Sequence, residues 1–284
     1  MLTETGYGYK IGNRIFSLNG KYVMGILNVT PDSFSDGGKY FSHSDAVKHA
    51  FEMINEGADI IDVGGESTRP GSDFVSADEE LRRVIPVIEK IISEIPDTII
   101  SVDTNKSVVA REALKAGAKI VNDISAGTFD AELLDTAASF DAAVILMHIK
   151  GTPKNMQEDT SYTDVCEEVK SFLLSRAEEA RRKGIDKIFI DPGIGFGKTA
   201  DQNFSLISKL PELRSTGIPV AIGVSRKSFL GKLLGLQPYE RENATVITET
   251  IAMLKGANII RTHNVKNAIQ AVRIVKEISA EQNV

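Results

Sequence analysis

Short polar side chains with complementary hydrogen-bonding capacity follow several apolar runs in this 284-residue chain. Asp103 and Asp191 accept hydrogen bonds, and the amide of Asn122 both accepts and donates them. If these side chains point into one pocket, they suit a flat ligand with several N–H donors and a carbonyl, such as an aminopyrimidinone ring. The sequence therefore predicts a pocket that recognises a pattern of hydrogen-bonding groups.

A second set of side chains is cationic or can become so, which suits phosphate or carboxylate. Its members are Arg69, Lys227, Arg261 and His263. Arg261 and His263 share one face of an expected strand, because side chains alternate with a period of two. Any one of these residues alone could equally form a salt bridge or a cap at a strand end. The placement of the whole set at strand ends is what predicts an anion site.

The stretch 22–38, YVMGILNVTPDSFSDGG, predicts an apolar strand whose inward row ends at Asn28, followed by a polar loop. Turn-forming residues flank a single aromatic side chain, Phe34, which would be costly to expose without a partner. An ordinary surface loop is the alternative, but long irregular loops in compact domains are usually functional or disordered. This loop and a second one at 65–76 have too few apolar residues to hold one closed shape, so both are expected to move.

Alternating strand-like and helix-like segments predict the fold that carries these residues. Eight short runs rich in Val and Ile are typical of parallel strands buried on both faces: 22–29, 59–64, 98–103, 118–123, 142–148, 187–191, 218–224 and 258–262. The clearest helical patterns lie at 77–94, 106–116, 164–183, 241–255 and 265–279. Eight such units in about 250 residues predict a (β/α)8 TIM barrel. No linker interrupts the chain, so residues 1–284 are expected to form one domain, with residues 1–20 as an N-terminal hairpin.

Composition and residue spacing exclude several classes of function. A net charge of −6 offers no basic face for nucleic acid, and no apolar run is long enough to span a membrane. The N-terminus lacks the basic and apolar regions of a secretory signal, so a cytoplasmic location is expected. The single cysteine, Cys166, lies on the apolar stripe of a helix and cannot form an internal disulfide. The four scattered histidines provide no zinc-ligand spacing.

Magnesium would leave almost no trace in the sequence. Mg²⁺ commonly keeps several waters and is held by one or two protein groups together with substrate phosphates. Asn28, at the end of the first predicted barrel strand, is a candidate for such a protein ligand.

The run 191–199, DPGIGFGKT, has only a partial likeness to a nucleotide-binding loop. A Walker loop needs glycine where this chain has Pro192, and the Rossmann spacing fails at the third glycine. A tight βα loop is the better interpretation, with glycines that allow the backbone to approach a ligand beside Asp191. Phe196 could then cover one face of a ring, or it could simply belong to the turn.

Seven segments closely resemble the dihydropteroate synthase family of folate biosynthesis. They are GILNVTPDSFSDGG at 25–38, GADIIDVGGESTRPGS at 57–72, SVDT at 101–104, NDI at 122–124, DPGIGFGKT at 191–199, SRKSFLG at 225–231 and RTH at 261–263. The resemblance implies a pterin-binding TIM barrel that joins hydroxymethyl-dihydropterin pyrophosphate to p-aminobenzoate, forming dihydropteroate and releasing pyrophosphate with magnesium. The chain departs from the common pattern at Ala126, where a second glycine is frequent, and at Asn264, where aspartate is usual.

The resemblance implies a role for each matching position. The pterin would be bound by Asp103, Asn122, Met147, Asp191, Phe196 and Lys227. The pyrophosphate would be bound by Arg69, Arg261 and His263, and Mg²⁺ by Asn28. The p-aminobenzoate would be bound by Phe34, Thr68, Pro70 and Ser228 once both early loops close. Catalysis would depend on Asp103, Asp191, Lys227, Arg261 and His263, and Asp32 or Asp36 would accept the proton that leaves the amine.

This chemistry needs charge stabilisation more than a strong base, because the aromatic amine is already a neutral nucleophile.

A homodimer with small-molecule substrates, and without nucleic-acid or membrane partners, is expected. One rival function is a methyltransferase that uses methyl-tetrahydrofolate, which would share the pterin pocket but would not need the pyrophosphate cations or the Phe34 loop. The other is a ligand-binding barrel without turnover, which only an assay for pyrophosphate release distinguishes from the enzyme.

Overall fold

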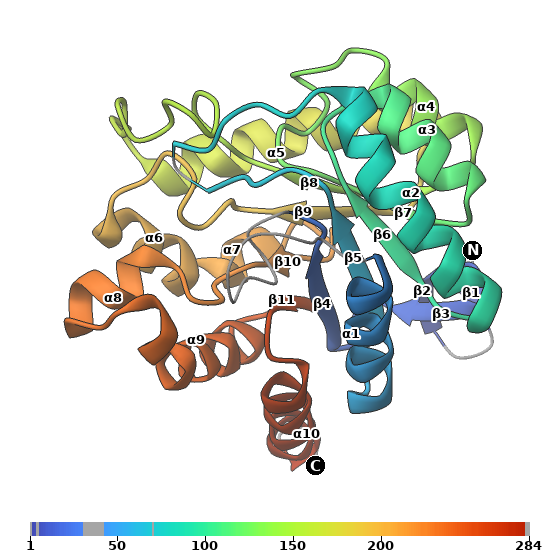
Figure 1. Cartoon of the computed structure of the whole chain (residues 1–284). Coiled ribbons are helices and arrows are strands. Elements are labelled where there is room, and N and C mark those ends of the chain that lie inside the picture. The colour runs from blue at the N-terminus through green and yellow to red at the C-terminus, as the bar shows by residue number, and fades with distance from the viewer. Residues whose placement is uncertain (1, 4–5, 31–42, 70, 282–284) are drawn as a thin grey trace.

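Eight parallel strands form a closed barrel in the computed structural model, which describes residues 2–3, 6–30, 43–69 and 71–281 (Figure 1). The barrel strands are β4 (Tyr22–Asn28), β5 (Ile60–Gly64), β6 (Ile100–Asp103), β7 (Ile120–Asp123), β8 (Ala143–Met147), β9 (Ile188–Asp191), β10 (Ala221–Ile222) and β11 (Ile259–Thr262). They are hydrogen-bonded in the order β10, β11, β4, β5, β6, β7, β8, β9. The barrel closes where Ile190 on β9 bridges Val220, just before β10. The predicted (β/α)8 architecture is confirmed.

The seventh barrel strand is shorter than predicted. The sequence indicated a strand over 218–224, whereas β10 has only two residues. Pro219 has no N–H to donate, and the N–H of Val220 donates to the side-chain Oδ1 of Asn258 over 3.0 Å instead of to a neighbouring backbone carbonyl. A side-chain hydrogen bond therefore replaces one backbone hydrogen bond between the strands. The hydrophobic pattern of the sequence cannot show this replacement.

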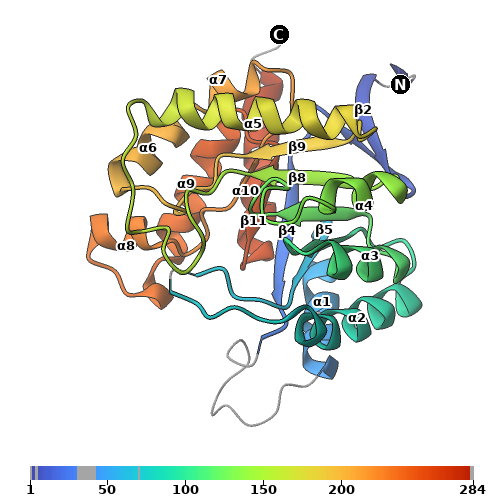
Figure 2. The same cartoon turned by 90° about the horizontal axis from the view of Figure 1, so that it is seen from above.

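Helices cover the outer face of the barrel (Figures 1 and 2). They are α1 (His43–Glu56), α2 (Ala77–Glu94), α3 (Ser107–Lys115), α4 (Leu133–Ser139), α5 (Val165–Arg182), α6 (Ala200–Ser208), α7 (Leu210–Arg214), α8 (Ser228–Leu234), α9 (Glu242–Leu254) and α10 (Val265–Glu281), with a 3-10 helix η1 (Pro238–Glu240). The five helices predicted from the sequence are present, each to within two residues at either end.

Local capping explains where two of the long helices begin. The Ser76 hydroxyl accepts the N–H of Glu79 at the start of α2, and the Asp164 carboxylate accepts the N–H groups of Cys166 and Glu167 at the start of α5. Apolar side chains from the strands and from the inner helix faces form the main core. Cys166 lies in this core as a free, buried thiol, as predicted. None of the described helices is long and apolar enough to cross a membrane.

A small antiparallel sheet covers the amino end of the barrel. It consists of β1 (Leu2–Thr3), β2 (Gly6–Ile11) and β3 (Arg14–Ser17), and it confirms the predicted hairpin. Ile11 and Phe16 pack against inward-facing strand residues such as Met24 and Phe189. Figures 1 and 2 show this sheet at the end of the barrel opposite α6 and α8. The barrel interior is therefore closed at one end, which leaves the carboxyl ends of the strands for function.

Phe16→Ala tests this closing role. Phe16 is 1% exposed, whereas the neighbouring Ile15 on the same strand is 49% exposed. Removing a fully buried phenyl ring should lower the free energy of unfolding by about 3–5 kcal/mol, because transfer and cavity costs add. Ile15→Ala, the matched control, should change it by less than about 1 kcal/mol. Urea unfolding measures both, and equal effects of the two substitutions would mean that the hairpin does not pack against the barrel.

Candidate active site

A hydrogen-bonded network around one arginine joins four strands at the carboxyl end of the barrel. The Arg261 guanidinium, from β11, donates through Nε to Asp62 Oδ2 and through Nη2 to Asp103 Oδ2, each over 2.6 Å. The Asn122 amide also donates to Asp62 Oδ2, over 3.0 Å. Since Asp62, Asp103 and Asn122 come from β5, β6 and β7, these residues connect opposite sides of the barrel. Asp62, Asp103, Asn122 and Arg261 are called the strand-end network below.

Strand register explains why these side chains meet. Gly64 on β5 pairs with Asp103 on β6, and a Cβ at position 64 would lie 3.3 Å from the Cβ of Asp103. Glycine there leaves room for the Asp103 carboxylate to reach Arg261. The sequence predicted roles for Asp103, Asn122 and Arg261 but none for Asp62. The available signal was a carboxylate inside the apolar run IIDVG, because a fully buried charge needs a partner.

Burial and charge act in opposite directions in this network. Burial raises the pKa of Asp103 to about 7; Arg261 opposes this rise, and the negative charge of Asp62 adds to it. Burial would lower the pKa of Arg261, but Asp62 and Asp103 raise it above its usual value, so the guanidinium stays charged. Two carboxylates therefore share one cation. A ligand that donates hydrogen bonds to Asp103 would stabilise the ionised carboxylate.

Asp191, Phe196 and Lys227 form a second group beside the network. Asp191 Oδ1 accepts the N–H of Gly193 over 2.7 Å, and Lys227 Nζ lies 4.0 Å from the centre of the Phe196 ring. Burial raises the pKa of Asp191 to about 6, although the Gly193 hydrogen bond and Lys227 lower it. Burial lowers the pKa of Lys227 to about 8, and Arg261 lowers it further. Both groups titrate close to neutral pH, which is typical of functional positions.

A small apolar cluster lies at the same end of the barrel as these polar groups. Met147 and Phe196 pack with Ile124, Ile149 and Met156. Both residues predicted to lie near the pterin ring thus belong to one apolar surface at the carboxyl end of β8 and β9. A flat ring could contact this surface with its face while its edge forms hydrogen bonds with carboxylates and amides.

Lys198 holds the glycine-rich loop after β9 from the inside. Its Nζ donates to the carbonyls of Gly193 and Phe196, over 3.0 and 2.9 Å, and lies 2.9 Å from His148 Nδ1. Burial lowers the pKa of Lys198 to about 7 and, with Lys198 adding to the effect, the pKa of His148 to about 3. This buried lysine binds the loop backbone, which agrees with the rejection of a Walker loop. The sequence predicted no structural role for Lys198.

Positive charge gathers around His263 at the end of β11. His263 Nδ1 lies 2.9 Å from Ser225 Oγ. Burial lowers the pKa of His263 to about 3, and Arg261, Arg226, Arg69 and Lys227 each lower it further. The imidazole is therefore neutral at pH 7, and the cationic character of this region comes from the surrounding arginines and lysine. Of the predicted anion ligands, Arg261 and His263 lie on neighbouring positions of the barrel end and Arg69 lies in an exposed loop.

The remaining predicted residues occupy the rim of this region or lie outside the described residues. Asn28 is half-buried at the end of β4, and its carboxamide forms no hydrogen bond with the described residues. Thr68 is half-buried in the loop after β5, and Ser228 is exposed as the first residue of α8. The predictions for Phe34, Pro70, Asp32 and Asp36 fall on residues that the structure does not describe. No group of three or more histidine, cysteine or acidic residues suited to a metal ion occurs among the described residues.

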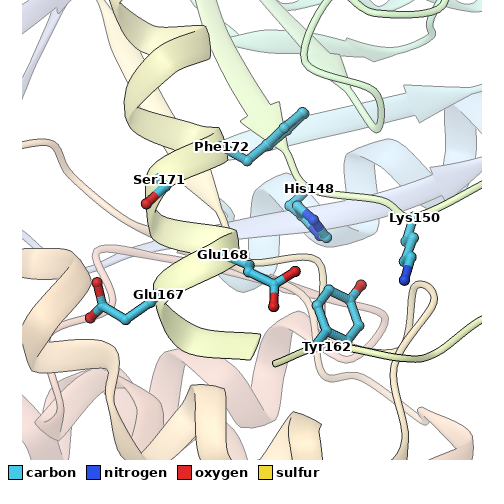
Figure 3. A pocket seen from close by; sticks show the side chains of 7 residues that line it. All are labelled: His148, Lys150, Tyr162, Glu167, Glu168, Ser171 and Phe172. Carbon is cyan, nitrogen blue, oxygen red and sulfur yellow. The ribbon is translucent and has the colours of Figure 1, made fainter. Parts of the chain in front are cut away.

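A hollow of about 510 Å³ lies between α5 and the segment that follows β8 (Figure 3). It is lined by His148, Lys150, Tyr162, Glu167, Glu168, Ser171 and Phe172. His148 packs edge-on against Phe172, with ring centres 5.0 Å apart. None of the predicted site residues lines this hollow, so the candidate site is the strand-end region and not the hollow.

A closed barrel with ring-binding and anion-binding groups at its carboxyl end defines a class of barrel enzymes that act on small molecules. A family model described as "Pterin binding enzyme" matches residues 24–263. Dihydropteroate synthase of Escherichia coli K12 is 48% identical over 94% of this chain and 95% of its own length. Dihydropteroate synthase of Synechocystis is 47% identical over 93% and 92%.

Solved structures agree with the family match. The dihydropteroate synthase of Yersinia pestis with a sulfonamide drug complex has a TM-score of 0.91 and 41% identity, covering 96% of this chain and 100% of that one. The Xanthomonas albilineans dihydropteroate synthase with 4-aminobenzoic acid has a TM-score of 0.89 and 41% identity, covering 96% and 99%. The chain belongs to the pterin-binding enzyme family and, within it, to the dihydropteroate synthases, which are transferases.

The raised pKa of Asp191 predicts how stability depends on pH. Its folded value of about 6 lies above the ordinary value of 3.8, so the folded protein keeps a proton that the unfolded chain releases between these values. The free energy of unfolding should therefore fall as pH rises from about 4 to 6 and stay lower above that range, by on the order of 2 kcal/mol for this group. Asp191→Asn cannot ionise, so its loss of stability between pH 4 and pH 7 should be smaller by this amount.

Urea unfolding at several pH values measures the difference. Asp201→Asn, which changes an exposed aspartate in the first turn of α6, is the control and should retain the full pH dependence. The same pH dependence in Asp191→Asn and in the unchanged protein would contradict the idea that Asp191 is buried with a raised pKa.

Proposed function

We propose that this protein condenses 6-hydroxymethyl-7,8-dihydropterin pyrophosphate with p-aminobenzoate to give 7,8-dihydropteroate and pyrophosphate. The strand-end network is the observation that carries the proposal, because it places buried acceptors for a ring beside a concentration of positive charge. Family membership agrees with this substrate pair. Relatives have been solved with 4-aminobenzoic acid and with 7,8-dihydropteroate.

The pterin would be recognised by hydrogen bonds at its edge and by apolar contact with its face. Asp103 and Asp191 would accept N–H groups of the ring, and Asn122 and Lys227 would donate to its acceptors. Met147 and Phe196 would cover one face. Selectivity would be strong, because each buried polar group left without a partner costs about 1–3 kcal/mol.

The diphosphate would bind where positive charge gathers. Arg261 uses Nε and Nη2 for the carboxylates, and its Nη1 forms no hydrogen bond with the described residues, so this donor can face a phosphate oxygen. His263 would donate as a neutral imidazole, and Arg69 would approach from the loop after β5. Arg261 would then contact the diphosphate through Nη1 while its Nη2 holds Asp103, the proposed acceptor for the pterin ring. One side chain would thus link the binding sites of the two parts of this substrate.

Magnesium fits the donor set in one particular way. Asn28 offers a half-buried carboxamide with no hydrogen bond to the described residues. One neutral oxygen is too weak a site for Mg²⁺ alone, but it suits an ion held mainly by two phosphates and water. When bound, the ion would neutralise charge on the diphosphate. Asn28 would orient it, as expected from the sequence.

The reaction would depend on stabilising separated charge. The bond between the pterin methylene carbon and the diphosphate oxygen breaks, and the amine nitrogen of p-aminobenzoate forms the new bond to that carbon. Arg69 and Arg261 would stabilise the departing diphosphate, while Asp103 and Asp191 would stabilise positive charge that develops on the pterin. Thr68 and Ser228, with Phe34 and Pro70, would hold p-aminobenzoate in line with the methylene carbon. The amine then loses a proton, for which Asp32 or Asp36 is the proposed acceptor.

An assay for pyrophosphate release tests the proposed function directly. The purified protein with both substrates and Mg²⁺ should release pyrophosphate and form dihydropteroate in equal amounts, and EDTA should lower the rate. Asn28→Ala should raise the Mg²⁺ concentration needed for half-maximal rate by about tenfold or more. Asn55→Ala, an exposed asparagine on α1, should leave this concentration unchanged.

The rival functions give different results in the same experiment. A barrel that binds the pterin without releasing pyrophosphate would be a binding protein, and methyl transfer from methyl-tetrahydrofolate would identify a methyltransferase. Either result would overturn the proposal. The cytoplasmic location expected from the sequence stays a prediction, which fractionation of the source cells would test.

We also propose that the protein forms a homodimer through α9 and α10. Ile247, Ile251 and Leu254 on α9 are 61%, 42% and 51% exposed, and Ile274 and Ile278 on α10 are 57% and 45% exposed. On α9 these residues are spaced by four and three positions, so they lie on one helix face. Since α9 and α10 pack against each other, the exposed side chains form an apolar surface of the kind that subunit interfaces cover.

Light scattering tests the dimer. The double change Ile247→Glu and Ile251→Glu should reduce the mass in solution by half, because it places charge in the proposed interface. Ile15→Glu, which alters an equally exposed isoleucine on the hairpin, should leave the mass unchanged. A monomer before any substitution, or an unchanged mass after the α9 substitutions, would reject this interface.

A further inference from the structure

The loop after β5, residues 65–76, carries three of the proposed substrate contacts, Thr68, Arg69 and Pro70, but has few apolar contacts of its own. Arg69, Gly71, Asp73 and Phe74 are all exposed. Ser72 ties the tip together, with its hydroxyl donating to the carbonyl of Ser67 over 2.5 Å and its N–H to the carbonyl of Arg69 over 3.0 Å. These bonds hold the tip together, and the N–H of Gly71 donates to the carbonyl of Pro153 over 3.1 Å. The direction of Arg69 therefore depends on this contact and on how the base of the loop is held.

Glu66 closes the base of this loop. Its Oε1 accepts the N–H of Val75 over 2.9 Å, so one side chain joins the two ends of a nine-residue excursion. Its Oε2 accepts Lys106 Nζ, which comes from a different part of the barrel. One carboxylate thus joins the two ends of the loop and links them to Lys106.

Lys106 connects this base to the pterin side of the barrel end. It lies three residues after Asp103, and the intervening Thr104 is fixed by its N–H, which donates to the carbonyl of Asn122 over 3.0 Å. Lys106 Nζ also donates to Glu80 Oε2, in the first turn of α2, over 2.6 Å. Among the described residues, Lys106 forms the only ion pair with a residue of the 65–76 loop, while Arg83 Nη1 from α2 donates to the carbonyl of Gly65 over 2.8 Å.

The three charges are mostly withdrawn from water. The side chains of Lys106, Glu66 and Glu80 are 12%, 15% and 0% exposed. Ion pairs in such surroundings are screened little by salt, and removal of one partner leaves a buried charge without compensation. Gly65 also packs against α2, because a Cβ there would lie 2.9 Å from Glu80 Cγ. The base of the loop is therefore rigid even though its tip is exposed.

We propose that Lys106, with Glu66 and Glu80, is a positioning residue that aims Arg69 and Thr68 at the diphosphate and p-aminobenzoate. The inference rests on the proposed function, in which Arg69 binds the diphosphate. Arg69 lies close enough to His263 for its charge to act on that imidazole, so the loop already faces the anion region. Lys106 itself contacts carboxylates and lies 5.0 Å from the Phe74 ring centre, and it touches none of the proposed ligand positions.

Binding measurements on Lys106→Met separate positioning from general stability. Calorimetry should find pyrophosphate with Mg²⁺ bound about tenfold more weakly, because a displaced loop loses its contacts steeply with distance. Hydroxymethylpterin without phosphate should bind within about twofold of the unchanged protein, and KM for p-aminobenzoate should rise. Lys106→Arg should restore much of the pyrophosphate affinity, since arginine can pair with both glutamates.

Matched variants make the result specific. Lys115→Met removes an exposed lysine that pairs with Glu112 on the same helix, α3, and should change neither affinity. Glu66→Gln keeps an acceptor for the Val75 N–H but loses the charge that pairs with Lys106. It should show the binding pattern predicted for Lys106→Met, and it provides a second test should Lys106→Met not fold. Adding Glu66→Gln to Lys106→Met should cause little further loss, because both changes break one interaction.

The outcomes distinguish this inference from the proposed function. If Arg69→Ala leaves pyrophosphate binding unchanged, the proposed role of Arg69 fails and the inference fails with it. If Arg69→Ala weakens pyrophosphate binding but Lys106→Met and Glu66→Gln do not, only the positioning role is overturned. Equal weakening of pyrophosphate and of phosphate-free pterin would also overturn it, since it would indicate a general disturbance of the barrel end.

Discussion

The pairing of Arg261 with Asp62 and Asp103 is the interaction on which the carboxyl end of the barrel depends. Two carboxylates this close, and this little exposed, would repel each other without a cation between them. The arginine would in turn be costly to bury without a carboxylate. Each of the three charges is therefore stable in this site only when the others are present. Their hydrogen bonds hold the carboxyl ends of β5, β6 and β11 together. Burial raises the pKa of Asp103 to about 7, so Arg261 only partly offsets the cost of burying this carboxylate beside Asp62.

Lysines around this centre support loops. Lys198 donates to two carbonyls of the loop that carries Phe196, and Lys106 joins the base of the loop that carries Arg69. Each follows a strand-end aspartate in the chain, Asp191 or Asp103. A long side chain with several donors can satisfy backbone carbonyls or carboxylates that a short loop leaves unpaired. The strand ends are thus held by the barrel, and the buried ammonium groups hold the adjoining loops to them by hydrogen bonds.

The sequence predicted most of the fold because its parallel strands have a strong local signal. Val- and Ile-rich runs separated by capped helices define the barrel without knowledge of any contact. Asp62 and Lys106 were given no role for the opposite reason: their partners lie 199, 40 and 26 positions away in the chain. Lys198 bonds the nearby Gly193 and Phe196, but no local pattern shows that this lysine is buried. Arg261 is 199 residues from Asp62 and 158 from Asp103, and no local pattern links them. The resemblance supplied site residues that spacing alone could not, and its assignments of Phe34 and Pro70 lie outside the described residues.

Asn122 and Asp123 are adjacent on β7, and their side chains have different partners because side chains alternate along a strand. Asn122 points to the strand-end network, whereas the Asp123 carboxylate accepts the N–H and hydroxyl of Ser125, over 2.8 and 2.7 Å, and also the N–H of Gly127. These bonds form a turn in which Ala126 has a φ of 52°, in the left-handed region that favours glycine. Glycine at this position would avoid that strain, and here the hydrogen bonds of Asp123 hold the turn. Asp123 thus holds the turn, while the side chain of its neighbour Asn122 joins the strand-end network.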